Sequence, residues 1–206
     1  MRIIAILIAA ITLSACAIGH KVDFTAQPAE IKVSSDKQVP VIVEDSRPYV
    51  LSGEKTPEFV GLRRGGLGKA FDVITGTGRT FASEVAEALV SGLKNNGVDA
   101  RVVTTGTDVA TIATGDADGT RIMKLTIVDW KTDIFFGMDV AFDLVLRVYD
   151  GTGRELAKSS VQGTGEKISE NGNATFEAGY ARVARATLSQ KLQALLEAPE
   201  IAAALN

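Results

Sequence analysis

Two stretches, IMKLTIVDW at residues 122–130 and DVAFDLVLRVY at residues 139–149, decide the fold of this chain. Apolar and polar side chains alternate along both stretches. Because successive side chains of a strand point to opposite faces, this period of two predicts two long strands with one buried face. The turn sequence DGTG at 150–153 then leads into a further strand at about 154–163. We therefore predict an antiparallel meander of three strands.

Two main helices accompany this meander. The first is predicted at about 81–96, where Thr80 is placed to cap the amino end and Gly97 to end the helix. The second follows Asn173 as a possible cap, has an apolar stripe from Phe176 to Leu195, and Pro199 ends or kinks it. Shorter apolar runs predict strands at 39–43, 59–62, 71–74 and 98–104. This order of elements predicts an α/β (α+β) fold, with a mixed, mainly antiparallel sheet and two main helices packed on one face.

The amino-terminal segment has the pattern of a bacterial lipoprotein signal. Arg2 precedes an apolar run from Ile3 to Leu13, which is too short to cross a bilayer core of ~30 Å. The run closes on LSAC, whose Cys16 is the only cysteine of the chain. In a lipoprotein this thiol receives diacylglycerol, the chain is cut before it, and the new amino group is acylated. We favour this over an ordinary secretory signal with a chance cysteine. A disulfide within the chain is excluded, because a lone cysteine has no partner.

These features predict three regions. Residues 1–15 form the signal peptide, and residues 16–38 form the lipidated cysteine and a polar tether with one short strand near 31–33. Residues 39–206 form a single α/β domain in the periplasm. Ala17, rather than Asp, follows the cysteine, which favours anchoring in the outer membrane. Apart from the covalent diacylglycerol and N-acyl chain on Cys16, we expect no cofactor and no metal.

The charge balance argues against a nucleic-acid partner. Residues 16–206 carry 21 basic and 25 acidic side chains, because Arg2 is the one charged residue removed with the signal peptide; the formal charge is therefore −4 with His20 neutral. A nucleic-acid-binding domain of this size would be expected to show a basic excess. We predict a membrane-attached protein with an envelope protein partner, and make no prediction of its oligomeric state.

Catalytic constellations are scarce in this sequence. His20, the only histidine, lies in the predicted tether, and Cys16 is consumed by lipid, which excludes Cys/His and Ser/His nucleophile sites and the usual zinc ligand sets. We read Asp45 and Arg47 first as a structural pair at a strand end. Acids at turns and strand ends are the remaining acid/base candidates, and we expect them to be solvated or structural: Glu44, Asp45, Asp72, Asp129 and Asp133. We therefore expect no enzyme.

A basic, glycine-rich segment, RRGGLGK at 63–69, is the first candidate contact. It lacks the Ser or Thr that a phosphate-binding Walker motif places after its lysine. The candidates for contact with an anion are Arg63, Arg64 and Lys69, since Arg forks hold phosphate or carboxylate and Gly backbones allow close approach. The alternative, which we favour, is an exposed loop whose charges are balanced by Glu54, Glu58 and Asp72.

An apolar segment, WKTDIFFGM at 130–138, is the second candidate contact, because it lies between the two long strands. Exposed, its large side chains would form a tip suited to protein or lipid contact. Folded back, they would close one end of the core, and the sequence favours neither. The candidate contact residues are Trp130, Ile134, Phe135 and Phe136.

The chain resembles the YajG-type family of bacterial lipoproteins, with a more distant likeness to envelope lipoproteins of the TolB-N-terminal and CsgG type. The likeness lies in the lipobox, in DSR at 45–47 after a strand, in the helix end at 89–97, and in IVDW at 127–130 and VYDG at 148–151. It covers most of residues 39–197. The resemblance implies a compact α/β domain without known catalysis that serves as an accessory or assembly part of an envelope machine.

Two functions follow as hypotheses. The first is a non-enzymatic adaptor, which predicts an exposed aromatic tip or an open sheet edge able to accept a strand. The second is an accessory protein that binds or transports lipid or anionic glycolipid. It predicts an apolar pocket between the sheet and the helices, with Arg63, Arg64 or Lys69 at its mouth.

Overall fold

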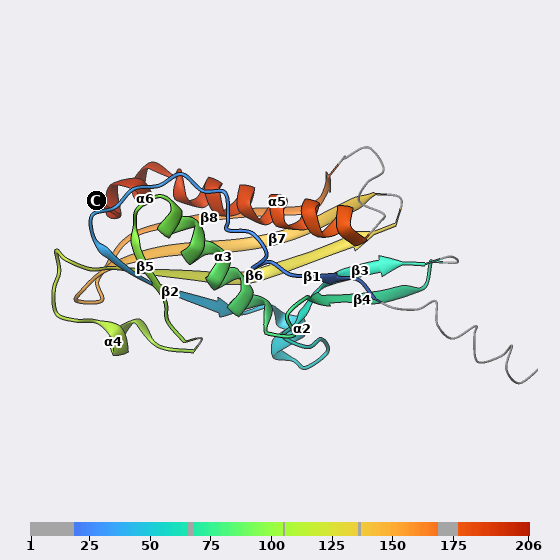
Figure 1. Ribbon diagram of the computed structural model, residues 1–206. Helices are drawn as coiled ribbons and strands as arrows, with labels where there is room; N and C mark the ends of the chain where they lie inside the picture. The colour runs from blue at the N-terminus through green and yellow to red at the C-terminus, as the bar shows by residue number, and fades with distance from the viewer. Residues whose placement is uncertain (1–18, 66–67, 105, 136, 169–176) are drawn as a thin grey trace, which may run out of the picture.

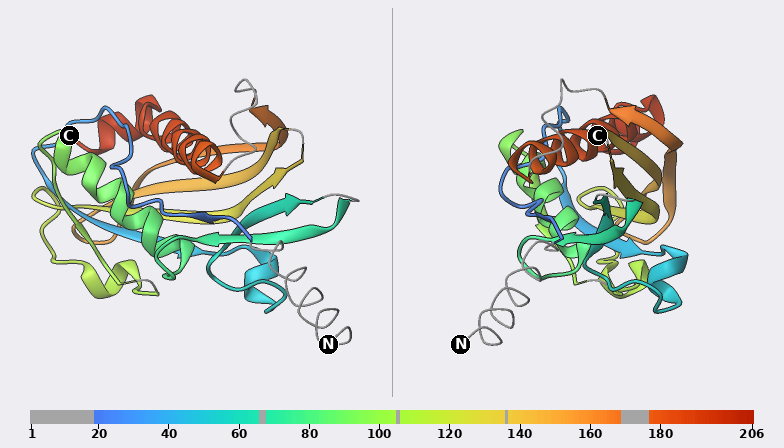
Figure 2. Two further views of the ribbon diagram at one scale, coloured as in Figure 1. Left: turned by 45° about the vertical axis from the view of Figure 1, so that its right-hand side comes forward. Right: turned by 90° about the vertical axis from the view of Figure 1, so that its right-hand side faces the viewer.

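The computed structural model describes residues 19–65, 68–104, 106–135, 137–168 and 177–206, which form a curled mixed sheet with helices on it (Figures 1 and 2). The strands are β1 (Lys21–Val22), β2 (Gln38–Asp45), β3 (Phe59–Arg64), β4 (Ala70–Thr75), β5 (Asp99–Val102), β6 (Arg121–Ile134), β7 (Met138–Asp150) and β8 (Glu155–Ile168). The helices are α2 (Pro48–Leu51), α3 (Phe81–Asn95), α4 (Val109–Ile112), α5 (Glu177–Leu196) and α6 (Pro199–Ala204). No helix within these ranges is long and apolar enough to cross a bilayer.

Strand β6 is the centre of the sheet. Along one edge it pairs antiparallel with β7, which pairs antiparallel with β8, so the predicted meander is confirmed. Along its other edge the first half of β6 pairs parallel with β2, and its last residues pair parallel with β3. Strand β5 lies beyond β2, and β4 and then β1 lie beyond β3. The sheet is thus mixed, and its longest pairings are antiparallel, as predicted.

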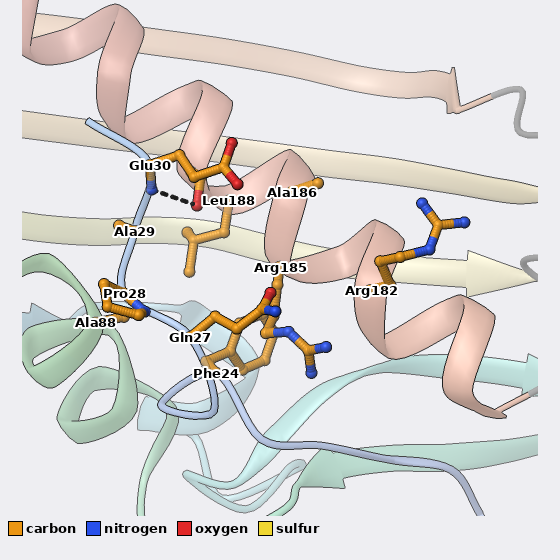
Figure 3. Close-up of a pocket in the computed structure, with 11 residues that line it drawn as sticks. Phe24, Gln27, Pro28, Ala29, Glu30, Ala88, Arg182, Arg185, Ala186 and Leu188 are labelled. Atoms are coloured by element: carbon orange, nitrogen blue, oxygen red, sulfur yellow. Dashed lines mark hydrogen bonds between the residues drawn. The ribbon is translucent and has the colours of Figure 1, made fainter. Parts of the chain in front are cut away.

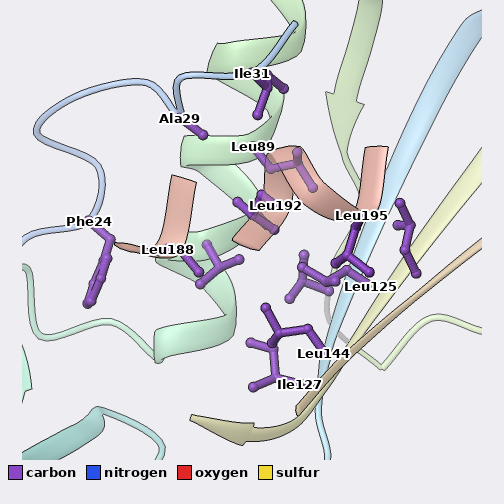
Figure 4. Packing of buried hydrophobic residues seen from close by; sticks show 14 of the residues in the cluster. Phe24, Ala29, Ile31, Leu89, Leu125, Ile127, Leu144, Leu188, Leu192 and Leu195 are labelled. Atoms are coloured by element: carbon purple, nitrogen blue, oxygen red, sulfur yellow. The ribbon is translucent and has the colours of Figure 1, made fainter. Parts of the chain in front are cut away.

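The two main helices pack on the same face of the sheet and share one core with it (Figure 4). In α3 the predicted apolar positions are buried, the Thr80 hydroxyl accepts the Ser83 amide at 3.2 Å, and Gly97 has φ +81°. Pro199 begins α6, so it ends the preceding helix rather than kinking it. The described stripe of α5 is buried and comprises Tyr180, Val183, Ala184, Leu188, Leu192 and Leu195. The predicted α+β fold class is confirmed.

A bulge in β6 changes which of its residues face the core. Ile127 pairs with Leu144 and Asp129 pairs with Asp143, so Val128 is the extra residue. Before the bulge odd-numbered residues such as Ile127 are buried, and after it even-numbered residues such as Trp130 are buried. One inserted residue reverses the phase of a strand, because side chains alternate with a period of two.

Residues 19–33 pack on the domain, which corrects the predicted tether for its described part. The segment lies between α3 and α5 (Figure 1), and its Ala29 amide donates to the Ala88 carbonyl at 3.0 Å. A side chain at Gly92 would meet the Ala29 carbonyl at 2.4 Å, so this close approach requires glycine. The expected strand near 31–33 is absent from this described segment, and β1 forms at Lys21–Val22 instead. Four apolar side chains of the segment belong to the core: Val22, Phe24, Ala29 and Ile31.

Buried Glu84 of α3 fixes this segment by accepting hydrogen bonds from two loops. Its Oε2 accepts the Phe24 amide at 2.8 Å, and its Oε1 accepts the Thr77 hydroxyl at 2.6 Å and the Thr77 amide at 3.1 Å. A buried carboxylate is tolerated only when such donors replace water. The sequence pattern gave no indication of this role, because Glu84 sits in the first helical turn, where an exposed acid is common.

Candidate functional site

The strand-end carboxylates considered as acid/base candidates all have partners in the structure. Within the described ranges, moreover, no three potential metal-ligating side chains cluster. The partners are Lys124 for Glu44, Arg47 for Asp45, Lys55 for Asp72, Tyr49 for Asp129 and Arg64 for Asp133. These pairings give each carboxylate a structural explanation.

The predicted Asp45–Arg47 pair is the centre of a buried structural cluster. Arg47 is 0% exposed and binds Asp45 in bidentate fashion, with Nε to Oδ1 at 2.8 Å and Nη2 to Oδ2 at 2.6 Å. Its Nη1 donates to the Phe59 carbonyl at 2.5 Å, and its guanidinium lies 5.1 Å from the centre of the Phe81 ring. Burial raises the pKa of the neighbouring Tyr49 hydroxyl. Since a fully enclosed guanidinium cannot meet a ligand, this cluster joins β2, β3 and α3 and is not a binding site.

The two candidate contact segments lie side by side at one end of the sheet. Arg63 of β3 pairs with Ile134 of β6, and Arg64 Nε donates to Asp133 Oδ1 at 2.8 Å. Figures 1 and 2 show that the β3–β4 and β6–β7 hairpins both project toward this end. The sequence treats residues 63–69 and 130–138 as separate features, and the parallel pairing of β3 with β6 brings them together.

The basic residues of this end remain accessible. The side chain of Arg64 is 40% exposed despite its pair with Asp133, and the Lys69 ammonium lies 5.5 Å from the centre of the Phe71 ring. Arg63 is half-buried. The acid that pairs with Arg64 is Asp133, which was not among the expected balancing acids. Of those, Asp72 pairs with Lys55 instead. An ion pair this exposed contributes little stability and leaves both groups able to exchange partners.

The apolar segment divides between core and surface. Trp130 is 0% and Ile134 2% exposed, so their prediction as contact residues is wrong; the β6 bulge turns both side chains inward. Phe135, at 47%, is exposed at the turn that follows β6. Phe136 lies outside the described residues. Of the described candidates, Phe135 is therefore the one that is exposed, at the end of the strand that pairs with Arg63.

We name this end of the molecule the hairpin surface and define it by Arg63, Arg64, Lys69 and Phe135. The chain enters the domain beside it. Gly19 lies so close to the Asp72 carbonyl of β4 that a side chain there would meet it at 2.1 Å, and the Ile74 amide donates to the His20 carbonyl at 3.2 Å. Since β1 runs parallel to β4, the amino end of β1 faces the same end of the sheet as Ala70, where β4 begins.

His20 is part of the domain, contrary to the prediction that it lies in a tether. It is 6% exposed, and its ring stacks on Tyr180 of α5 with centres 5.8 Å apart. The Tyr180 hydroxyl is in turn 2.6 Å from the Thr132 hydroxyl of β6, and burial raises the pKa of Tyr180. His20 thus helps to fix the first described residues against α5.

A groove of about 470 Å³ lies between residues 24–30 and α5 (Figure 3). Arg185 lies along it, its Nη1 donates to the Asp23 carbonyl at 3.3 Å, and its Nε is buried without a hydrogen-bond partner. Ser189 closes one side by accepting the Glu30 amide at 3.3 Å. The carrier hypothesis placed Arg63, Arg64 or Lys69 at the pocket mouth, and these residues do not line this groove. Sequence reasoning missed it, because it considered only the apolar stripe of α5.

No protein-family model and no curated protein matches the chain. Among solved structures, the chain is similar to a DUF330 protein from Xanthomonas campestris, with 13% identity over 90% of this chain and 95% of that chain and a TM-score of 0.49. It is also similar to PelC from Paraburkholderia phytofirmans, crystallised as a dodecamer (10% identity, 82% and 93% covered, TM-score 0.43). A third similarity is to lipoprotein GNA1162 from Neisseria meningitidis (14% identity, 66% and 88% covered, TM-score 0.29). These values are too low to carry over an activity, ligand or assembly.

Proposed function

We propose that this chain is a lipid-anchored, non-enzymatic lipoprotein of the bacterial envelope that acts as an accessory or adaptor protein. Cys16 would carry the diacylglycerol and N-acyl chains as its only non-protein groups, and the domain would face the periplasm from the outer membrane. A relation to the YajG-type family belongs to the same proposal. The LSAC sequence at 13–16 supports the anchor, and the open edge of β8 supports the adaptor.

Strand β8 offers a long sheet edge to a partner. Over its described length β8 pairs with β7 alone, so the backbone groups on its other edge have no strand partner. Register shifts interrupt its pairing near both ends, and between them Ala157 to Gly163 pair regularly with β7. Such an edge accepts an added strand through backbone hydrogen bonds. Ser160 and Gln162 are exposed there and present a polar face.

Photocrosslinking in cells tests the adaptor. A photoreactive amino acid replaces Ser160 or Gln162 in the full-length protein, and Asn95 on the exposed face of α3 serves as the matched control site. We expect a discrete protein adduct from the β8 sites that is absent at Asn95. If the β8 sites give the same diffuse pattern as Asn95, the adaptor proposal through β8 is wrong.

Cys16→Ser tests the anchor separately. The unchanged protein should incorporate labelled fatty acid and float with membranes, because several acyl chains give effectively stable attachment. Cys16→Ser should incorporate none. Equal fatty-acid labelling of the two proteins would contradict lipidation at this residue.

The second candidate, a lipid or anionic-glycolipid binder, is favoured by the groove beside α5. Its volume of about 470 Å³ lies in the range of ligand sites, roughly 300–1,000 Å³, and Arg185 is a donor with unused hydrogen-bonding capacity. Native mass spectrometry of the purified protein should then show a bound lipid that Arg185→Gln reduces. If Arg185→Gln retains the same amount of bound lipid, the lipid does not bind in this groove.

A further inference from the structure

We propose that the hairpin surface is a membrane-contact site, in which Arg63, Arg64 and Lys69 bind headgroup phosphates of anionic lipid and Phe135 enters the interface. This inference rests on the proposed lipidation at Cys16 and adds an orientation: the domain is held against the bilayer by this end. The occupant is the surface of the membrane that holds the anchor.

The position of the anchor is the first argument. Gly19 is packed against Asp72 of β4, so the chain is fixed to the domain at this residue. Three residues separate Gly19 from Cys16, and an extended chain spans at most ~3.6 Å per residue. Cys16 must therefore lie within about 11 Å of Gly19. An acylated Cys16 is buried to its backbone at the bilayer surface, which leaves no room for a tether that lifts the domain away.

The direction of the strands is the second argument. Strand β4 begins at Ala70, two residues before Asp72, and Lys69 precedes it. Two residues of strand correspond to about 7 Å. The distance from Gly19 to Lys69 is thus comparable to the longest distance from Gly19 to Cys16. The same holds for Arg63 and Arg64, which pair with the start of β4. Figure 1 shows the carboxyl-terminal α6 at the opposite end of the molecule.

Charge is the third argument. The two hairpin ends carry an excess of one positive charge, although residues 16–206 carry −4 overall. From Arg63 and Asp133 outward, the described charged residues are Arg63, Arg64 and Lys69 against Asp133 and Asp139. Basic side chains near an anionic leaflet each strengthen attachment, by roughly fivefold per charge. The side chain of Arg64 is 40% exposed, so its guanidinium can bind a phosphate in addition to Asp133.

Phe135 is the fourth argument. It is 47% exposed at the turn after β6, and the neighbouring strand β3 carries Arg63 and Arg64. An exposed aromatic ring at a basic end of the molecule suits the boundary between headgroups and acyl chains, where apolar and charged groups are both accommodated. A flat protein partner would not by itself require the anchor to emerge at the same end.

The test uses the full-length lipoprotein reconstituted into vesicles. Phe135→Cys carries a thiol-reactive environment-sensitive fluorophore, because acylated Cys16 leaves no other thiol. Leu156→Cys is the matched control: Leu156 is also an exposed apolar residue, at 37%, and it lies at the start of β8, whose far end pairs with the start of β7 next to Phe135. Vesicles are phosphatidylcholine alone or phosphatidylcholine with phosphatidylglycerol.

We expect the label at 135, and not at 156, to shift to the blue and to resist a water-soluble quencher in vesicles with phosphatidylglycerol. Arg63→Gln with Lys69→Gln should lower the equilibrium constant for lipid insertion by roughly 25-fold, which is roughly fivefold for each of the two charges. Arg64 is kept, because its removal would leave Asp133 uncompensated.

The outcomes separate this inference from the proposed function. If no variant floats with vesicles and none carries fatty acid, the lipoprotein proposal fails, and the orientation fails with it. If all variants float but the label at 135 is as water-accessible as that at 156, the membrane-contact site is wrong while the anchor stands. A discrete protein adduct from a photoreactive group at 135 would likewise assign this surface to a protein partner.

Discussion

Phe24→Ala tests whether residues 19–33 belong to the folded domain. Phe24 is 1% exposed and packs edge-on against Phe81 of α3, with ring centres 5.0 Å apart. Its backbone amide donates to buried Glu84 at 2.8 Å, so side chain and backbone fix the same point of the segment. Removing the ring leaves a void between the segment and α3, while the hydrogen bond to Glu84 is retained.

The expected loss is about 3 kcal/mol in the free energy of unfolding. Phe→Ala in a core typically costs roughly 3–5 kcal/mol, from lost transfer free energy and the residual cavity. The lower end applies here, because Phe24 also borders the groove beside α5 and the loop can partly collapse. For a chain of this size, 3 kcal/mol lowers the melting temperature by roughly 6–12 °C.

Urea unfolding followed by the fluorescence of Trp130 measures this loss, because Trp130 is the only tryptophan and is 0% exposed. Leu51→Ala is the control: Leu51 is 71% exposed, and its truncation should stay within about 0.5 kcal/mol of the unchanged protein. If Phe24→Ala costs no more than Leu51→Ala, the segment is not part of the cooperative core, and the short reach between anchor and domain loses its basis.

Three further predictions concern the sheet and its turns. Arg47→Met should lower the free energy of unfolding by about 3–5 kcal/mol in urea titrations, because it removes the guanidinium that binds Asp45 in bidentate fashion; a loss below 1 kcal/mol would mean that the pair is dispensable. Gly61→Ala should be strongly destabilising, since a Cβ there would lie 1.9 Å from a threonine hydroxyl of β6, whereas Gly137→Ala meets nothing within 4 Å and should be nearly neutral; equal melting temperatures would refute the contact. Hydrogen bonds from the following turn lower the pKa of Asp150 to about 2, so its contribution to stability is present above pH 4 and lost as the pH falls toward 2; Asp150→Asn should flatten this part of the pH–stability curve, and an unchanged slope would contradict it.

The elements with a regular period could be predicted from sequence. Alternation over 139–149 matches β7, whose even-numbered residues are all buried, because no bulge interrupts that strand. The Thr80 cap and the Gly97 end of α3 were predictable because each has a local physical cause in one residue. These features could be predicted because they depend on neighbouring residues in the sequence or on a strictly regular period.

Two kinds of structure escaped prediction. The β6 bulge inserts one residue and reverses the phase of its strand, so Trp130 faces the core. An uninterrupted period of two would have placed Trp130 on the opposite face of the sheet. Residues 19–33 carry isolated apolar side chains with no period, and their burial depends on long-range partners such as Glu84 and Gly92 in α3. Neither partner can be recognised until the two segments are placed side by side.

The packing of residues 19–33 also changes how the two candidate contacts are understood. With a tether over 16–38, the basic segment at 63–69 and the aromatic segment at 130–138 would have no fixed relation to the membrane. Because Gly19 is packed on β4, an acylated Cys16 would have at most about 11 Å of chain before this fixed point, and β1 runs parallel to β4 from the hairpin end. The pairing of β3 with β6 then places Phe135 beside the arginines at that same end. Under the proposed lipidation, an anchor this short would orient the domain as well as attach it, and the β8 edge, whose carboxyl end lies beside the start of β7, would remain available to a partner.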